Sequence, residues 1–133
     1  MKQIYIAYSM TNSRQDISVI EKLVEWLNKK QYKIIRPSYF LFPDSVIKEA
    51  LKSISSADLI IADVSEYSHG VGFEIGYSFA LGKKIVIICN ISSKKAVSGV
   101  IRGLFQRIIY YHSSEELIEE LSTELKSRKK TLR

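Results

Sequence analysis

Residues 57–76 read ADLIIADVSEYSHGVGFEIG, and this stretch decides the fold. Its first half is apolar without regular alternation, which is typical of a strand buried on both faces of a parallel sheet. Serines and glycines follow and indicate a turn. After the turn the chain is predicted to enter a helix that carries Glu74 in its first turn. The stretch is therefore predicted to form a strand, a turn and a helix, the repeating unit of an α/β domain.

The predicted turn is also where we expect the chemistry. A helix N-terminus exposes backbone N–H groups that favour an anion, so Glu74 would stand beside an anion site. A carboxylate next to a phosphate pocket suits an enzyme that attacks a phosphorylated sugar at a fixed distance from its phosphate. An acid in a first turn also interacts favourably with the helix dipole without any catalytic role. Ser65 and Ser68 are either helix caps or phosphate ligands.

Outward from this stretch, strands and helices alternate along the whole chain. The predicted strands are Lys2–Tyr8, Tyr32–Ile35, Asp58–Val64, Lys84–Asn90 and Arg107–Tyr111. The predicted helices run from an Asp16 N-cap to Lys30, from Asp44 or Ser45 to Ser55, from Val71 to Gly82, over a short turn at Val97–Leu104, and from a Ser113–Ser114 cap to Lys126, with 91–98 as a loop. Right-handed crossovers then give a flavodoxin-like, doubly wound parallel sheet in the order 2-1-3-4-5. Its ligand crevice should lie after Tyr8 and after Val64.

Length and composition fit one domain, because the chain has 133 residues of which 46% are hydrophobic. The net charge of +6 is uneven: KSRKKTLR at 126–133 holds five of the 20 Lys and Arg residues, which leaves 15 basic against 14 acidic side chains before it. We therefore divide the chain into a domain at 1–126 and a solvated basic tail at 127–133, and expect no nucleic-acid or membrane partner.

The single cysteine, Cys89, and the absence of a signal peptide or a membrane-spanning run predict a cytoplasmic protein. His69, His112 and Cys89 lack the spacing of metal ligands, so no metal site is expected. Gly70, Gly72 and Gly76 give G-x-G-x-x-x-G, but this run follows the third predicted strand instead of the first. A dinucleotide site is therefore disfavoured.

Two motifs carry a resemblance to a known family. The segment SADLIIADVSxxSxGVGFEIGYSFAxGKK at 56–84 resembles the signature of the nucleoside 2-deoxyribosyltransferase superfamily. Together with SGVIRG at 98–103, it is most similar to the branch of 2'-deoxynucleoside 5'-phosphate N-hydrolases. The resemblance implies that Glu74 is a nucleophile that attacks C1' of the sugar, forms a glycosyl ester and expels the base, with Tyr5 close to its carboxylate. No cofactor is implied.

The resemblance also implies where the 5'-phosphate binds. Ser9, Ser68 and the Gly70 amide match phosphate ligands of the hydrolase branch, and Ser98 matches a serine supplied by a second subunit, which implies a homodimer with a shared active site. The transferase branch has Asp where this chain has Ser68. A carboxylate there would repel a phosphate dianion but accept a hydrogen bond from a free 5'-hydroxyl. Ser68 thus favours a nucleotide over a nucleoside.

This chain departs from the family pattern at three places. Ala50 stands where relatives have an Asp that helps to handle the leaving base, and Glu49 is one position away, about 100° around the helix. Thr11 replaces an arginine, for which Arg14 is close enough in sequence to substitute. Tyr8 replaces a glycine.

The predicted function is hydrolysis of the N-glycosidic bond of a nucleoside or deoxynucleoside 5'-monophosphate through a covalent glycosyl-Glu intermediate. The alternatives are a nucleoside 2-deoxyribosyltransferase and a nucleotide-binding module that has lost turnover with the second carboxylate. The identity of the base is left to loop residues such as Met10, Tyr39 and Phe40.

Overall fold

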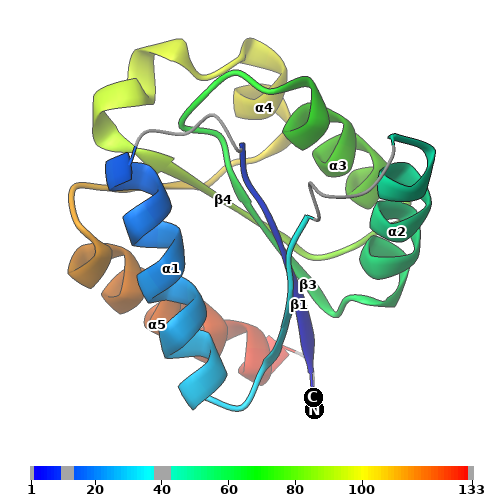
Figure 1. Cartoon of the computed structure of the whole chain (residues 1–133). Coiled ribbons are helices and arrows are strands. Elements are labelled where there is room, and N and C mark those ends of the chain that lie inside the picture. Colours follow the sequence, from blue (N-terminus) through cyan, green and yellow to red (C-terminus); the bar gives the residue numbers. More distant parts are fainter. Residues whose placement is uncertain (1, 10–13, 38–42, 132–133) are drawn as a thin grey trace.

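A computed structural model describes residues 2–9, 14–37 and 43–131 (Figure 1). Its strands are β1 (Gln3–Ala7), β2 (Lys33–Ile35), β3 (Leu59–Asp63), β4 (Ile85–Asn90) and β5 (Ile108–Tyr111). Its helices are α1 (Arg14–Lys29), α2 (Pro43–Ser56), α3 (His69–Ala80), α4 (Gly99–Leu104) and α5 (Ser114–Thr131), and a 3-10 helix, η1 (Ile91–Ala96), follows β4.

The five strands form one parallel sheet in the order β2-β1-β3-β4-β5. This confirms the predicted single-domain, flavodoxin-like fold. β3 lies at the centre of the sheet, and all five of its residues are buried, as its apolar sequence predicted. The chain order reverses between β1 and β3, so the carboxyl ends of these two strands form the switch point where such sheets bind ligands.

Helices cover both faces of the sheet. In Figure 1, α1 and α5 lie on one side, and α2, α3 and α4 lie on the other. Successive strand residues alternate between these layers, so Ile4 and Ile6 pack with α1 and α5, whereas Tyr5 and Ala7 pack toward α2 and α3. Tyr5 therefore lies on the same face of the sheet as the helix that carries Glu74.

Helices α1, α2 and α3 begin earlier than predicted. α1 begins at Arg14, so Asp16 is not its N-cap, and α2 begins at Pro43, a residue that suits a first helical position. α3 begins at His69, because the Ser68 hydroxyl caps it by accepting a hydrogen bond from the Val71 N–H at 3.2 Å. The cause is common to the three helices: apolar spacing marks a helix only where it meets the core, and their first residues are mostly polar or small.

The earlier start of α3 moves Glu74 from the first turn to the second, so the prediction that it lies in the first turn is wrong. The field of a helix dipole falls off within the first turn. A favourable interaction with the helix dipole is therefore a weaker reason for an acid at position 74 than the sequence suggested.

Two other differences from the sequence prediction exceed two residues, whereas the remaining boundaries differ by one or two residues. Residues 91–96, predicted as a loop, form η1, which Asn90 caps by accepting a hydrogen bond from the Ser92 N–H. α5 continues to Thr131 instead of ending near Lys126, because Lys and Arg are good helix formers and suit the C-terminal end of a helix dipole. The division into a domain and a basic tail stays a prediction.

A buried polar network fixes the carboxyl edge of the sheet. Asp63, only 1% exposed at the end of β3, accepts hydrogen bonds from the Ser65 N–H at 2.9 Å and the Tyr111 hydroxyl at 3.0 Å. The Ser65 hydroxyl also accepts a hydrogen bond from the Asn90 N–H at 2.7 Å. The network joins the ends of β3, β4 and β5 and so holds the chain that leads into α3.

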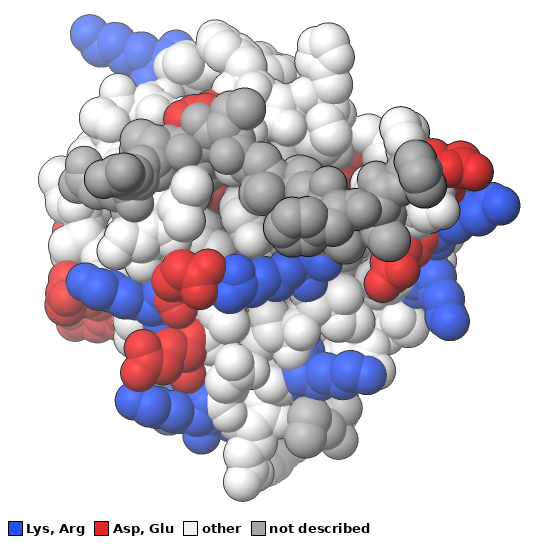
Figure 2. All heavy atoms as spheres, viewed as in Figure 1, with Lys and Arg blue, Asp and Glu red and all other residues white. Residues whose placement is uncertain are grey.

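The surface carries both signs of charge. On the face shown in Figure 2, Lys and Arg side chains lie next to Asp and Glu side chains across the middle of the molecule. Within the described residues, no helix is long and apolar enough to cross a bilayer.

Candidate active site

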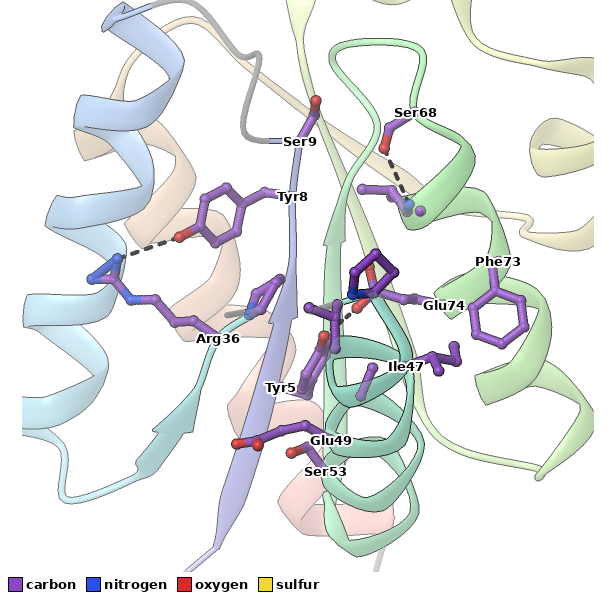
Figure 3. Close-up of a pocket in the computed structure, with 16 residues that line it drawn as sticks. Tyr5, Tyr8, Ser9, Arg36, Ile47, Glu49, Ser53, Ser68, Phe73 and Glu74 are labelled. Atoms are coloured by element: carbon purple, nitrogen blue, oxygen red, sulfur yellow. Dashed lines mark hydrogen bonds between the residues drawn. The ribbon is translucent and has the colours of Figure 1, made fainter. Parts of the chain in front are cut away.

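A pocket of about 520 Å³ opens at the switch point of the sheet. Three parts of the chain line it: the end of β1, the turn into α3 with the start of that helix, and α2 with the residues after β2 (Figure 3). Its lining residues are Tyr5, Tyr8, Ser9, Arg36, Pro37, Pro43, Val46, Ile47, Glu49, Ala50, Ser53, Ser68, Gly70, Val71, Phe73 and Glu74. The pocket thus lies where the topology predicted a ligand crevice.

Glu74 and Tyr5 meet at the inner wall of this pocket. Glu74 is only 8% exposed, and the hydroxyl of Tyr5, itself 1% exposed, donates a hydrogen bond to Glu74 Oε2. Burial raises the pKa of the Glu74 carboxyl to about 7, because desolvation disfavours the charged form, while the Tyr5 hydrogen bond acts in the opposite direction. A desolvated carboxylate with one fixed donor and an open side toward a pocket has the properties of a positioned nucleophile.

The anion turn lies at the outer end of the same pocket and comprises Ser9, Ser68 and Gly70. Ser68 and Gly70 stand at the N-terminus of α3, and Ser9, 7% exposed, is the second residue after β1. Gly70 is in the first turn of α3, where the backbone N–H groups have no carbonyl partner inside the helix. Ser9, Ser68 and Gly70 therefore line the same pocket as Glu74, and their role as phosphate ligands stays a prediction.

α2 forms the wall opposite the anion turn. Ala50, where the resemblance implied an Asp in relatives, lines the pocket, so this position offers the site no acid. Glu49 lines the pocket as well, with an exposed side chain, and Ser53 lies one helical turn further on. The rotation of about 100° between neighbouring positions does not take Glu49 away from the site, because the pocket spans a wide arc of the α2 surface.

Arg36 lines the pocket and was missed by sequence reasoning. It follows β2, and its guanidinium pairs with both carboxylate oxygens of Glu21 at 2.6 and 2.9 Å and lies 3.4 Å from the Tyr8 hydroxyl. The order of the strands contained the signal: β2 pairs with β1, so a residue after β2 lies beside the end of β1.

Two other candidates lie outside the pocket, and the side chains of two more are not described by the structure. Ser98 caps α4, is exposed and does not line the pocket. Ser65 belongs to the Asp63 network instead of capping α3. Arg14 is the first residue of α1, but its side chain lies outside the described residues, as does Met10 altogether. Among the residues that the structure describes, no group of three His, Cys, Asp or Glu side chains could hold a metal ion.

Known proteins resemble this chain over nearly its whole length. A family model described as nucleoside 2-deoxyribosyltransferase matches residues 4–120, which include every pocket residue. A protein of Thermofilum pendens named "Putative 2'-deoxynucleoside 5'-phosphate N-hydrolase 1" is 27% identical over 92% of this chain and 94% of its own length. The 5-hydroxymethyl-dUMP N-hydrolase of Danio rerio is 28% identical over 88% of this chain and 93% of its own length.

A solved structure extends the similarity to three dimensions. The CMP N-glycosidase of Clostridium botulinum is similar with a TM-score of 0.76 and 28% identity, over 92% of this chain and 99% of its own.

The raised pKa predicts how Glu74 affects stability. A carboxyl with a folded-state pKa near 7 and an ordinary value of 4.5 favours the folded state below pH 4.5, and that contribution is lost as the pH rises to 7 and above. Glu74→Gln removes this titration. We therefore compare the free energies of unfolding of Glu74→Gln and wild type at each pH. The value for the variant minus the value for wild type should increase by up to about 3 kcal/mol from pH 4.5 to pH 8.

Urea unfolding at the two pH values measures this difference, with the exposed Glu119→Gln on α5 as the matched control. Tyr5→Phe should extend the loss of stability to higher pH, because the hydroxyl that lowers the Glu74 pKa is gone. Parallel pH curves for wild type and Glu74→Gln would contradict the assignment of the raised pKa.

Proposed function

This chain belongs to the nucleoside 2-deoxyribosyltransferase family, and we propose that it hydrolyses the N-glycosidic bond of a nucleoside 5'-monophosphate, releasing the free base and the sugar 5-phosphate. One observation carries the proposal. Glu74 is a buried carboxylate bonded to Tyr5, and it lies one helical turn from Gly70 in a pocket that both residues line. That spacing separates the anion turn from the nucleophile by about 6 Å along the helix axis. The names of the three similar proteins support the same class of reaction, as nucleotide N-hydrolases or an N-glycosidase.

The reaction would proceed in two steps on Glu74. A carboxylate oxygen attacks C1', the bond from C1' to the base nitrogen breaks, and the electron pair leaves with the base, which takes up a proton. Water then attacks C1' and breaks its bond to the Glu74 oxygen, so that the water oxygen stays on the sugar and Glu74 leaves as a carboxylate. The proton that water loses balances the proton that the base takes up. With a pKa of about 7, a large share of Glu74 is ionised at neutral pH. Tyr5 is a positioning residue that holds one carboxylate oxygen and leaves the other for attack.

Phosphate recognition would come from the anion turn. The Ser68 hydroxyl and the Gly70 N–H are donors placed at the N-terminus of α3, which is a favourable environment for a dianion, and the Ser9 hydroxyl lines the same pocket. Ser68 would keep its capping bond to the Val71 N–H and donate its own proton to the phosphate, because a hydroxyl accepts and donates at once. No metal or organic cofactor is part of this proposal.

A homodimer with a shared site is part of the proposal. Large apolar side chains of α3, α4 and the residue after α3 are exposed on the surface: Phe73, Phe79, Leu81, Val100 and Leu104. We take these side chains together as the apolar patch of the proposed interface. Phe73 also lines the pocket, and Phe79 contacts Phe105, the residue after α4, edge to face at 6.4 Å between ring centroids. Exposed apolar patches mark interaction surfaces. A second copy on this patch would cover the rim of the pocket and bring its own Ser98 toward the phosphate.

Two alternatives remain distinct from hydrolysis. A transferase would pass the sugar to a second base instead of water, and Ser68 in place of Asp argues against it. A binding module without turnover is favoured by Ala50, which leaves no acid at the family's second position. A cytoplasmic location, consistent with the free and buried Cys89, completes the proposal.

Base release tests the reaction. Wild type, Glu74→Ala and the Glu119→Ala control are incubated with deoxy- and ribonucleoside 5'-monophosphates, and free base is measured by chromatography. We expect release by wild type and the control, and a loss of at least about 1,000-fold in Glu74→Ala, since no other group supplies the nucleophile. Base release by Glu74→Ala at the wild-type rate would overturn the role of Glu74. With a second free base present, a new nucleotide would indicate transfer instead of hydrolysis.

Ser68→Asp tests phosphate recognition without removing the cap, because Asp caps helices as well as Ser does. The added carboxylate should repel the phosphate and raise KM for monophosphates by about tenfold or more, since a charge-assisted hydrogen bond becomes a like-charge contact. Ser113→Asp is the matched control, because Ser113 bonds the Glu116 N–H at the start of α5, far from the pocket. Equal KM values in both variants would exclude Ser68 as a phosphate ligand.

Mixing inactive variants tests the shared site. A Ser98→Ala chain retains Glu74, and a Glu74→Ala chain retains Ser98, so each mixed dimer has one intact site. Random pairing should restore about a quarter of the wild-type activity, because half of the dimers are mixed and each has one of two sites intact. Activity that stays at the average of the two separate variants would contradict a site shared between subunits.

A further inference from the structure

The inner half of the pocket contains polar groups that the proposed reaction does not use. If the phosphate binds at the anion turn and C1' lies at Glu74, the base must occupy the space lined by α2 and the residues after β2. The polar side chains of this half are Tyr8, Arg36, Glu49 and Ser53 (Figure 3). The guanidinium of Arg36 pairs with both oxygens of Glu21 and donates to the Tyr8 hydroxyl at 3.4 Å. Tyr8 and Arg36 therefore already contact each other, and Glu49 and Ser53 are the other groups available to contact a base.

Glu49 and Ser53 form one polar edge of α2. They are four residues apart, so their side chains stand on the same face of the helix, one turn apart. Ser53 is 9% exposed. Within the described parts of the chain, neither the Glu49 carboxylate nor the Ser53 hydroxyl has a hydrogen-bond or ion-pair partner. A buried hydroxyl without a partner costs free energy unless a ligand supplies one.

We propose that Glu49 and Ser53 read the polar edge of the base and select a base with an exocyclic amino group over uracil or thymine. This inference rests on the proposed function, because it takes the positions of the phosphate and the sugar from it. The Glu49 carboxylate accepts hydrogen bonds only, so it pairs with an amino group such as cytosine N4. The Ser53 hydroxyl can donate to a neighbouring ring nitrogen or carbonyl oxygen.

Uracil presents the opposite pattern to this edge. It has a carbonyl oxygen where cytosine has the amino group, and a carbonyl beside a carboxylate places two acceptors against each other. Uracil and cytosine have nearly the same shape, so the difference in binding reports hydrogen bonding and not fit. A site built to bond a polar group discriminates strongly against an analogue that lacks it.

The test compares cytosine and uracil 5'-monophosphates. Affinities are measured by calorimetry in a Glu74→Gln background, which blocks the proposed nucleophile, and kcat/KM is measured with Glu74 intact. Each readout is repeated in Glu49→Gln and Ser53→Ala, with Glu119→Gln on α5 as the matched control. Thermal unfolding checks that each variant is folded.

We expect a cytosine preference of about tenfold or more in the protein with Glu49 and in the control. Glu49→Gln should reduce this preference to about twofold or less, because the amide can turn its NH₂ group toward the uracil carbonyl. Ser53→Ala should weaken cytosine binding by about threefold to tenfold. The Glu119 control should leave every ratio unchanged.

The outcomes separate this inference from the reaction. Base release without a cytosine preference, or a preference that Glu49→Gln leaves unchanged, overturns the inference and keeps the hydrolase. A Glu49-dependent cytosine preference in binding without any base release supports the inference and overturns the hydrolase. Failure to bind any of the monophosphates overturns both.

Discussion

The hydrogen bond between Tyr5 and Glu74 is the contact on which the site depends, because it joins the central part of the sheet to the helix that carries the proposed nucleophile. Both side chains are almost fully buried, and no positive charge accompanies Glu74 in the contacts that the structure describes around it. A buried carboxylate without a cation would normally be excluded from a protein interior. Its retention here is understandable if the reaction needs a desolvated carboxylate at one fixed place.

The parallel sheet supplies the rigidity that this contact requires. Tyr5 is fixed by strands on both sides, opposite Ile35 and Ile60. The turn that leads to Glu74 is held at its start, after β3, by the Asp63 network and at its end, where α3 begins, by the Ser68 cap. The nucleophile therefore gains its position from the two most constrained strands, while the groups proposed to bind phosphate lie at the ends of the same elements, where backbone N–H groups are exposed.

The sequence predicted the sheet completely, and the limits of that prediction have physical causes. Apolar runs without alternation, such as 59–62, reveal strands buried on both faces, and the crossover rule then leaves little freedom in topology. Helix starts were missed because a first turn need not touch the core. Arg36 was missed because its closeness to the site comes from the pairing of β2 with β1, which no local pattern records. The pocket residues on α3 could be anticipated because strand, turn and helix are contiguous in the sequence there. Which α2 residues line the pocket depends instead on the rotation of that helix about its own axis.

The orientation of α2 leads to a division of roles between two glutamates. Glu74 is desolvated and has a raised pKa, which suits a group that must form and release a covalent bond. Glu49 is exposed at the pocket wall, where a carboxylate offers hydrogen-bond acceptors to a ligand. The replacement of an acid by Ala50 then need not mean the loss of a second carboxylate. Glu49 on the same helix offers a carboxylate from the neighbouring position, where it would face the polar edge of the base. Under the proposed function, Glu74 would remain the nucleophile and Ser9, Ser68 and Gly70 the phosphate ligands, while α2 would select the base.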